Sequence, residues 1–246
     1  MALTSRTRAL LSNIIDIDGR PVPVKIRHHA RARRYILKVD LTRGEVCITA
    51  PKRGSHKQAM AFAQSHSKWI GERLAEIPST VGFCEGAEIP FQGRAHTIRH
   101  VDQKRGVIHV GPPTDEGGLP EILVPGDPNF LERRLTDWLR AQAKQELSLR
   151  VAQHASALDV RPARITIRDQ SSRWGSCSQS RTLSFSWRLI LTPPDVLDYV
   201  AAHEVAHLVH MDHSKSFWKC VATLYPNYRP AVKWLEEQGP SLHRYG

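Results

Sequence analysis

The sequence predicts an α+β fold in two domains. Short β-branched segments separated by turn signals dominate residues 1–125, with one helical stretch among them. A long helical pattern then begins at Asp127-Pro128, and a short apolar helix near residue 200 follows two further strand-like segments. We therefore expect a β-rich N-terminal domain over residues 1–125. We expect a second domain over residues 126–246, with a small sheet and a helix that carries the candidate site.

The N-terminal domain begins with strands. Asp18-Gly19 is a turn signal between two apolar segments. Arg43-Gly44 separates two β-branched segments, so residues 35–49 are predicted to form a hairpin. Apolar residues at helical spacing then predict one helix over residues 55–77, which ends before Pro78. The strands predicted for this domain are residues 14–17, 22–24, 35–39, 46–49, 88–91, 96–100, 107–110 and 122–124.

The C-terminal domain opens with a long helix. From Asp127-Pro128 to about Leu158 the apolar positions share one broad helical face. Thr192-Pro193-Pro194-Asp195 offers an N-cap hydroxyl, a proline at the first helical position and an acid at N3, so it marks the start of another helix. The remaining elements predicted are strands over residues 164–168 and 183–191 and helices over residues 214–224 and 231–238.

The segment His203-Glu204-Val205-Ala206-His207 has the spacing of a zinc site. Residues i and i+4 of a helix share one face, so both imidazoles can reach one metal ion. A catalytic zinc needs three protein ligands and an open position for water, and Glu204 is placed to take a proton from that water. The alternative is an exposed polar turn of a helix. Apolar neighbours indicate instead a largely buried helix, in which polar groups need partners.

Two histidines are candidates for the third ligand. His210 lies on the same helical face as His203, but three ligands in a row along one helix suit a tetrahedral metal badly. His213 follows Met211-Asp212, where the chain can turn back and approach from another direction. We favour His213, which leaves His210 as a residue behind the metal or on the surface.

Composition indicates the setting of the protein. The four cysteines are scattered without a CxxC pair, so the sequence indicates no disulfide framework and favours a protein of a reducing compartment. The first fifteen residues lack the apolar core of a secretory signal, and no segment approaches the length of a membrane span. We expect a cytoplasmic protein with no membrane partner.

The N-terminal region is strongly basic. Residues 1–60 hold thirteen Lys and Arg against four acids, within a chain of net charge +11. Such a cluster can bind phosphate backbones through counterion release, and the alternative is a solvated edge strand whose charges prevent aggregation. The candidate nucleic-acid contacts are Lys25, Arg27, Arg31, Arg33 and Arg34.

The C-terminal motifs resemble the YgjP-like family of zinc metallopeptidases, a zincin-like fold. The segments that carry the resemblance are Arg173-Trp174-Gly175-Ser176-Cys177-Ser178, Trp187-Arg188-Leu189-Ile190, Asp198-Tyr199-Val200, the histidine motif, His213-Ser214 and Phe217-Trp218. The resemblance implies one Zn²⁺ held by His203, His207 and His213, with Glu204 as the base. WLM and SprT-like proteases, which cut proteins crosslinked to DNA, share the ligand spacing. This chain has Ser186 where the family usually has Asn and Ser172 where it has Thr, which leaves the fold in little doubt.

The segment around Arg173, Trp174 and Gly175 has two possible roles. It can form a strand beside the zinc that binds an extended peptide substrate, or its aromatic and glycine can simply pack a loop against the zinc helix. We expect Cys177 to be a packed thiol, and Phe217 and Trp218 to lie in the core.

The function predicted is hydrolysis of peptide bonds in a protein or peptide substrate by a zinc-activated water, with Glu204 as the general base. The alternative is a nucleic-acid-associated protein, either a protease recruited by DNA or a non-catalytic zinc-binding module. Glu204 discriminates between them, because a closed structural zinc site needs no base and usually has four protein ligands.

Overall fold

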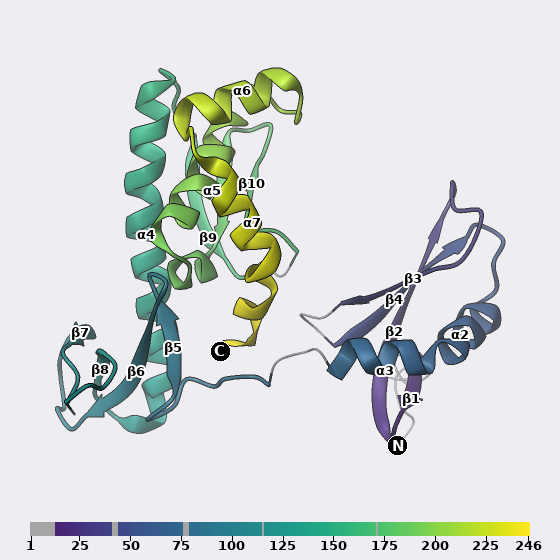
Figure 1. Cartoon of the computed structure of the whole chain (residues 1–246), viewed down its shortest axis with the longest axis horizontal. Coiled ribbons are helices and arrows are strands. Elements are labelled where there is room, and N and C mark those ends of the chain that lie inside the picture. The colour runs from purple at the N-terminus through teal and green to yellow at the C-terminus, as the bar shows by residue number, and fades with distance from the viewer. Residues whose placement is uncertain (1–12, 41–43, 76–78, 115, 171) are drawn as a thin grey trace. The chain divides into compact units, whose positions relative to one another are not determined.

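The computed structural model describes residues 13–40, 44–75, 79–114, 116–170 and 172–246, and its elements are labelled in Figure 1. The chain divides into two compact units, Met1–Ser79 and Thr80–Gly246. This division differs from the predicted boundary near residue 126. The reason is that apolar side chains of residues 83–124 share one core with the long helix that follows them.

The N-terminal unit contains a four-stranded sheet of order β1-β2-β4-β3. The predicted turn at Asp18-Gly19 and the predicted hairpin of residues 35–49 are confirmed, since β1 pairs with β2 and β3 with β4 in antiparallel fashion. The first turn places Asp18 and Gly19 at positive φ, 52° and 79°, as a tight hairpin of this length requires. The strands are β1 (Ile14–Ile17), β2 (Arg20–His29), β3 (Ile36–Asp40) and β4 (Glu45–Pro51).

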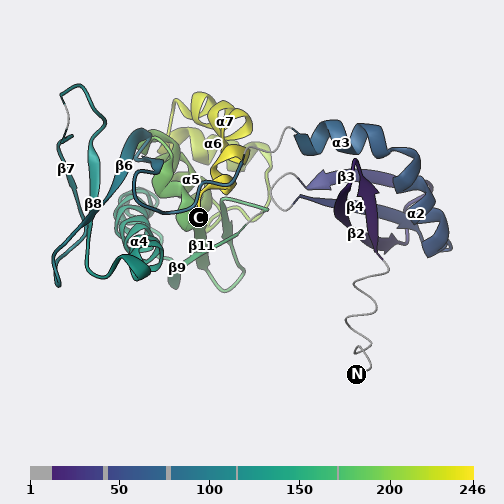
Figure 2. The same ribbon diagram turned by 90° about the horizontal axis from the view of Figure 1, so that it is seen from below.

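Two helices, α2 (His56–Ser65) and α3 (Ser67–Ala75), cover one face of this sheet (Figure 2). The single helix predicted over residues 55–77 is wrong, because the helix is interrupted at His66. This residue is the C-cap of α2, and its ring nitrogen Nδ1 lies 2.9 Å from the carbonyl oxygen of Phe62. Ser55 and Gln58 form a capping box at the start of α2.

The C-terminal unit begins with a sheet of order β5-β6-β8-β7, which packs against the long helix α4 (Leu131–Ala157). Leucines 135, 139 and 147 of α4 recur at multiples of four residues and are fully buried, as the predicted broad apolar face requires. The strands are β5 (Glu88–Phe91), β6 (Arg94–Val101), β7 (His109–Gly111) and β8 (Glu121–Pro125), and the 3-10 turn η1 (Pro128–Phe130) precedes α4.

A second sheet of this unit, of order β10-β11-β9, contains β9 (Arg164–Arg168), β10 (Gly175–Cys177) and β11 (Thr182–Ser186). The strand predicted over residues 183–191 ends at Ser186. There the hydroxyl of Ser186 accepts a hydrogen bond from the backbone N–H of Arg188, and the chain enters the buried 3-10 turn η2 (Trp187–Leu191).

Helix α5 (Pro194–Ala206) is packed by α4, α6 (Lys215–Leu224), α7 (Tyr228–Glu237) and β10 (Figure 1). The predicted N-cap of α5 is wrong, because the hydroxyl of Thr192 donates to the carbonyl of Leu189 at 2.8 Å and no side chain caps this helix. Helix α6 is confirmed and is capped by Ser214. The last helix begins three residues before its predicted start and leads into the 3-10 segment η3 (Gly239–Arg244).

Within the described ranges, no helix has both the length and the apolar character of a membrane span.

Candidate metal centre and active site

His203, His207 and His213 converge on one position. One ring nitrogen of each lies within 4.8 Å of the other two, and Nε2 of His203 lies 3.3 Å from Nε2 of His213. Helix α5 ends at Ala206, so His207 is its C-cap and the following turn brings His213 back toward the helix. His210 is not part of the cluster. The geometry thus brings together the three histidines that the sequence favoured.

Hydrogen bonds orient two of these rings. Nδ1 of His207 donates to the backbone carbonyl of His210 at 2.9 Å, and the hydroxyl of Tyr199 lies 3.3 Å from Nδ1 of His203. A carbonyl can only accept, so the proton of His207 is on Nδ1 and its Nε2 is free to bind a metal ion, whereas the hydroxyl of Tyr199 orients the ring of His203. Sequence reasoning missed Tyr199, although it stands four residues before His203 and therefore on the same helical face.

The protein environment favours the neutral form of His203 and of His207. Burial, followed by the neighbouring His207 and His213, lowers the pKa of His203 to about 4. Burial also lowers the pKa of His207. Neutral imidazole is the form that binds a metal ion, so protons compete weakly for these nitrogens near neutral pH.

Glu204 is buried beside the cluster, with 5% of its surface exposed, and its Oε2 has no hydrogen-bond partner among the described residues. Burial raises the pKa of this carboxyl to about 8, against an opposing effect of Arg173. A buried carboxyl oxygen without a partner is costly. It fits a site that receives a metal ion with its water, and the donor set of three imidazoles fits the same group.

Strand β10 lies at the edge of its sheet and against Glu204. Its backbone is so close that a Cβ at Gly175 would lie 2.5 Å from Oε1 of Glu204. Trp174, just before the strand, stacks on His243 of η3 with ring centroids 5.3 Å apart. Both roles considered for this segment are therefore compatible with the structure: Trp174 packs against the C-terminal segment, and β10 has an edge beside the cluster.

Phe217, Trp218 and Cys177 pack around the histidine cluster. Phe217 is fully buried and stacks on the ring of His207 at 4.4 Å, and Trp218 is partly buried and stacks on Tyr228 at 5.5 Å. Cys177 lines the space next to the histidines. Burial and then the charge of Glu204 raise the pKa of its thiol, which favours the protonated form over a metal-binding thiolate.

The candidate nucleic-acid residues belong to the N-terminal unit. The ammonium of Lys25 forms a 2.5 Å ion pair with Glu45, and Arg27 stands two positions further along β2. Arg31, Arg33 and Arg34 follow the strand and are exposed. Strand β2 pairs with β1 on one side and with β4 on the other, so it is an inner strand of the sheet and not the edge strand of the alternative.

Three imidazoles and a buried carboxyl group gathered at the end of one helix of an α+β fold are a set of side chains that suits a catalytic metal ion. The model of the YgjP-like family, described as a metallopeptidase domain, matches residues 33–238, so the chain belongs to the YgjP-like metallopeptidases. Peptidases of this kind act on protein or peptide substrates through a bound metal ion.

A solved structure similar to part of this chain is the metallopeptidase zymogen of Pyrococcus abyssi abylysin. The two share 21% identity over 37% of this chain and 89% of the abylysin chain, with a TM-score of 0.33. A search of curated proteins gives no match. The family assignment rests on the match over residues 33–238.

Proposed function

We propose that this protein is a zinc-dependent peptidase in which His203, His207 and His213 hold one Zn²⁺ and Glu204 is the general base. The observation that carries the proposal is the buried carboxyl of Glu204, which lies beside a cluster of three imidazoles and has an oxygen without a hydrogen-bond partner among the described residues. When bound, zinc would polarise the scissile carbonyl and acidify a water molecule. Glu204 takes the proton of the attacking water and delivers it to the leaving amine.

The neighbouring elements have supporting roles. The carbonyl of His210 holds His207 in the tautomer that ligation through Nε2 requires, and the hydroxyl of Tyr199 orients the ring of His203. The free edge of β10 suits an extended peptide, which can add to the sheet through backbone hydrogen bonds. Arg173, Trp174 and Gly175 are thus the residues proposed to contact the substrate.

A non-catalytic zinc module is the less favoured alternative. A closed structural site usually has four protein ligands, whereas the cluster found in the described part of the chain has three. A purely structural site would also leave unexplained why Oε2 of the buried Glu204 has no hydrogen-bond partner among the described residues. The free thiols of all four cysteines fit the reducing, cytoplasmic location that the sequence predicts, and that location stays a proposal.

The ligand assignment is tested by replacing each candidate histidine. We expect His213→Ala to lower zinc affinity by more than about 100-fold and to abolish casein cleavage, since even outer-sphere changes cost about 10–100-fold. His210→Ala is the matched control and should retain zinc, because His210 contributes a backbone carbonyl. Zinc content after dialysis and cleavage of casein measure both. Zinc loss in His210→Ala with retention in His213→Ala would contradict the assignment.

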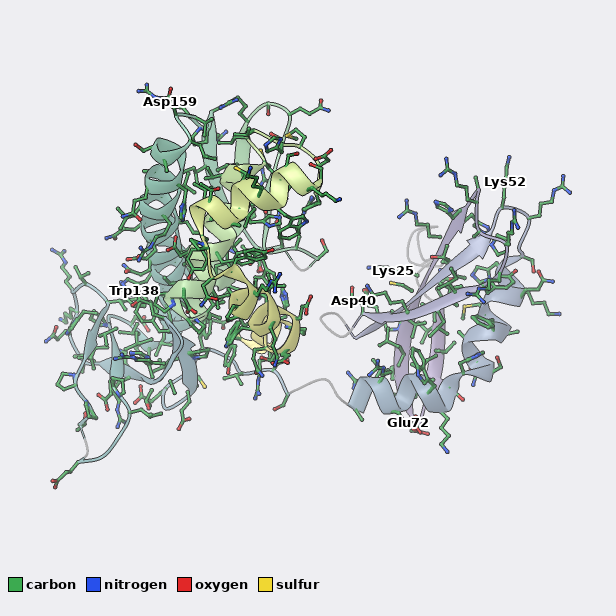
Figure 3. The ribbon with its side chains drawn as sticks, turned by 45° about the horizontal axis from the view of Figure 1, so that its top comes forward. Lys25, Asp40, Lys52, Glu72, Trp138 and Asp159 are labelled. Atoms are coloured by element: carbon green, nitrogen blue, oxygen red, sulfur yellow. The ribbon has the colours of Figure 1, made fainter. Side chains whose placement is uncertain are left out.

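A second property is proposed for the N-terminal unit, namely contact with nucleic acid through a basic pole, defined as residues 28–34 and 52–57. Pairing of β2 with β4 joins these segments, with Nδ1 of His28 lying 3.1 Å from the carbonyl oxygen of Pro51. Lys52 lies at one end of the unit and Glu72 at the other (Figure 3). The pole contains no acid and six exposed cations: Arg31, Arg33, Arg34, Lys52, Arg53 and Lys57.

The chemistry of the pole favours a phosphate backbone over a membrane surface. Four of its six cations are arginines, whose planar guanidinium groups bind phosphate in bidentate fashion. The two segments contain no large apolar side chain that could insert into a bilayer. Lys25, already paired with Glu45, lies outside this pole.

Binding of a DNA duplex and of single strands at several salt concentrations tests the pole. The double variant Arg33→Ala/Arg53→Ala should weaken binding and make the slope of log K against log salt shallower by about two, one for each lost phosphate contact. The control Arg20→Ala/Lys68→Ala removes two cations outside the pole and should leave the slope unchanged. If both double variants had the same slope of log K against log salt, the proposed contact of nucleic acid with the basic pole would be contradicted.

A further inference from the structure

Two cavities meet at the candidate catalytic residues. One has a volume of about 280 Å³ and the other about 250 Å³, and both are lined by Gly175, His203 and Glu204. The larger extends between the helices α5 and α7, and the smaller extends over Cys177 and His213. A peptide bond held at Glu204 therefore lies where the two cavities join.

The larger cavity, which we name the Trp174–Leu235 pocket, has apolar walls. Its walls are Trp174 beside β10, Tyr199 and Val200 of α5, and Leu235 of α7. Tyr199 and Val200 are 6% and 4% exposed. An apolar cavity with few polar groups is the usual form of a ligand pocket.

Stacking contacts hold the aromatic walls in place. The ring of Tyr199 stacks on Tyr228 at 6.2 Å, and Tyr228 stacks in turn on Trp218. On the opposite wall, Trp174 stacks on His243 and would lie 3.1 Å from a Cβ at Gly239. The pocket is therefore formed before any substrate enters, and the cost of ordering its walls on binding is small.

We propose that the Trp174–Leu235 pocket receives the substrate side chain next to the scissile bond and selects large apolar residues there. This inference rests on the proposed peptidase function. Glu204 and His203 are part of the pocket's own lining, so a residue adjacent to the reacting carbonyl is the one that reaches it. Its apolar walls disfavour polar and charged side chains, which would lose their water without gaining enough hydrogen-bond partners.

The test uses the full-length zinc-loaded protein and a set of peptides that differ only in the two residues flanking the cleaved bond. We expect wild type to favour Phe, Leu or Met over Gly at one of these two positions by at least about tenfold in kcat/KM. Leu235→Trp fills the pocket and should remove that preference, by lowering kcat/KM for the large apolar peptides toward the value for the Gly peptide. Leu235→Ala enlarges it and should shift the preference toward Trp.

Lys233→Trp places the same bulky residue on the exposed side of α7 and controls for disturbance of the helix. It should keep the wild-type preference, and zinc content of all variants reports that the site is intact. Cleavage by wild type with a preference that neither Leu235 variant alters would overturn the pocket alone. Absence of cleavage of any peptide by zinc-loaded wild type would overturn both the pocket and the proposed function.

Discussion

Glu204→Gln should retain zinc and lower kcat/KM for peptide cleavage by about 10²–10⁴-fold, the usual contribution of a general base. Glutamine has nearly the shape of glutamate and fits the buried position, but it cannot accept a proton from the attacking water. The loss should appear in kcat, because the carboxyl acts in the transition state. Cleavage of a fluorogenic peptide and zinc analysis of the same sample measure the two properties together.

Glu132→Gln, an exposed carboxylate in the first turn of α4, is the matched control and should keep full activity. If Glu204→Gln cleaved peptides as fast as wild type, the assigned base would be wrong, and the orphaned carboxyl would need another explanation. Loss of zinc together with activity would indicate that Glu204 serves the metal site itself.

The metal-free protein offers a second measure of the same carboxyl. Its pKa is about 8 in the folded chain and near 4.5 when exposed, so the folded state holds the proton more tightly. Its stabilising contribution is therefore present below about pH 4.5 and is lost as pH rises through about 8. The melting temperature of the metal-free protein should fall over this interval in wild type more than in Glu204→Gln.

Local signals in the sequence predicted much of the fold. Asp18-Gly19 set the first hairpin and Ser214 the start of α6, because each acts within a few residues. The break at His66 was missed because α2 and α3 both present apolar faces, so the helical period runs on across the break. The run Trp187–Leu191 was missed because it is buried on all sides, and periodicity does not separate a buried strand from a buried turn.

The convergence of the three candidate histidines was predictable for a geometric reason. The i, i+4 spacing places His203 and His207 on one helical face. The turn after the end of the helix lets His213, rather than His210, approach these two side chains from another direction. The stacking of Trp174 on His243 joins residues far apart in the sequence, so no local pattern could indicate it. The Trp174–Leu235 pocket likewise needs three separate segments to be in place.

Gly175→Ala should lower kcat/KM by at least about 100-fold, because it displaces Glu204, the proposed base. A Cβ at position 175 would lie 2.5, 2.6 and 2.8 Å from Oε1, Cγ and Cδ of Glu204, closer than real contacts allow. These contacts include Cγ and Cδ as well as the end of the side chain, so either the side chain of Glu204 or β10 must shift. A misplacement of about 1 Å at a reacting group costs about 10²-fold in rate. The overpacking should also cost about 1–3 kcal/mol of stability.

Gly82→Ala is the control for the change from glycine to alanine, since a Cβ there meets nothing within 4 Å. Kinetics of the double variant Gly175→Ala/Glu204→Gln then separate two explanations. If Gly175 acts through the position of Glu204, the double variant should be no slower than Glu204→Gln alone, because residues that act as a unit are not additive. If Gly175 acts instead by admitting the peptide backbone to the edge of β10, the two losses should multiply. Losses that multiply would mean that Gly175 contributes to substrate binding and does not act by positioning Glu204.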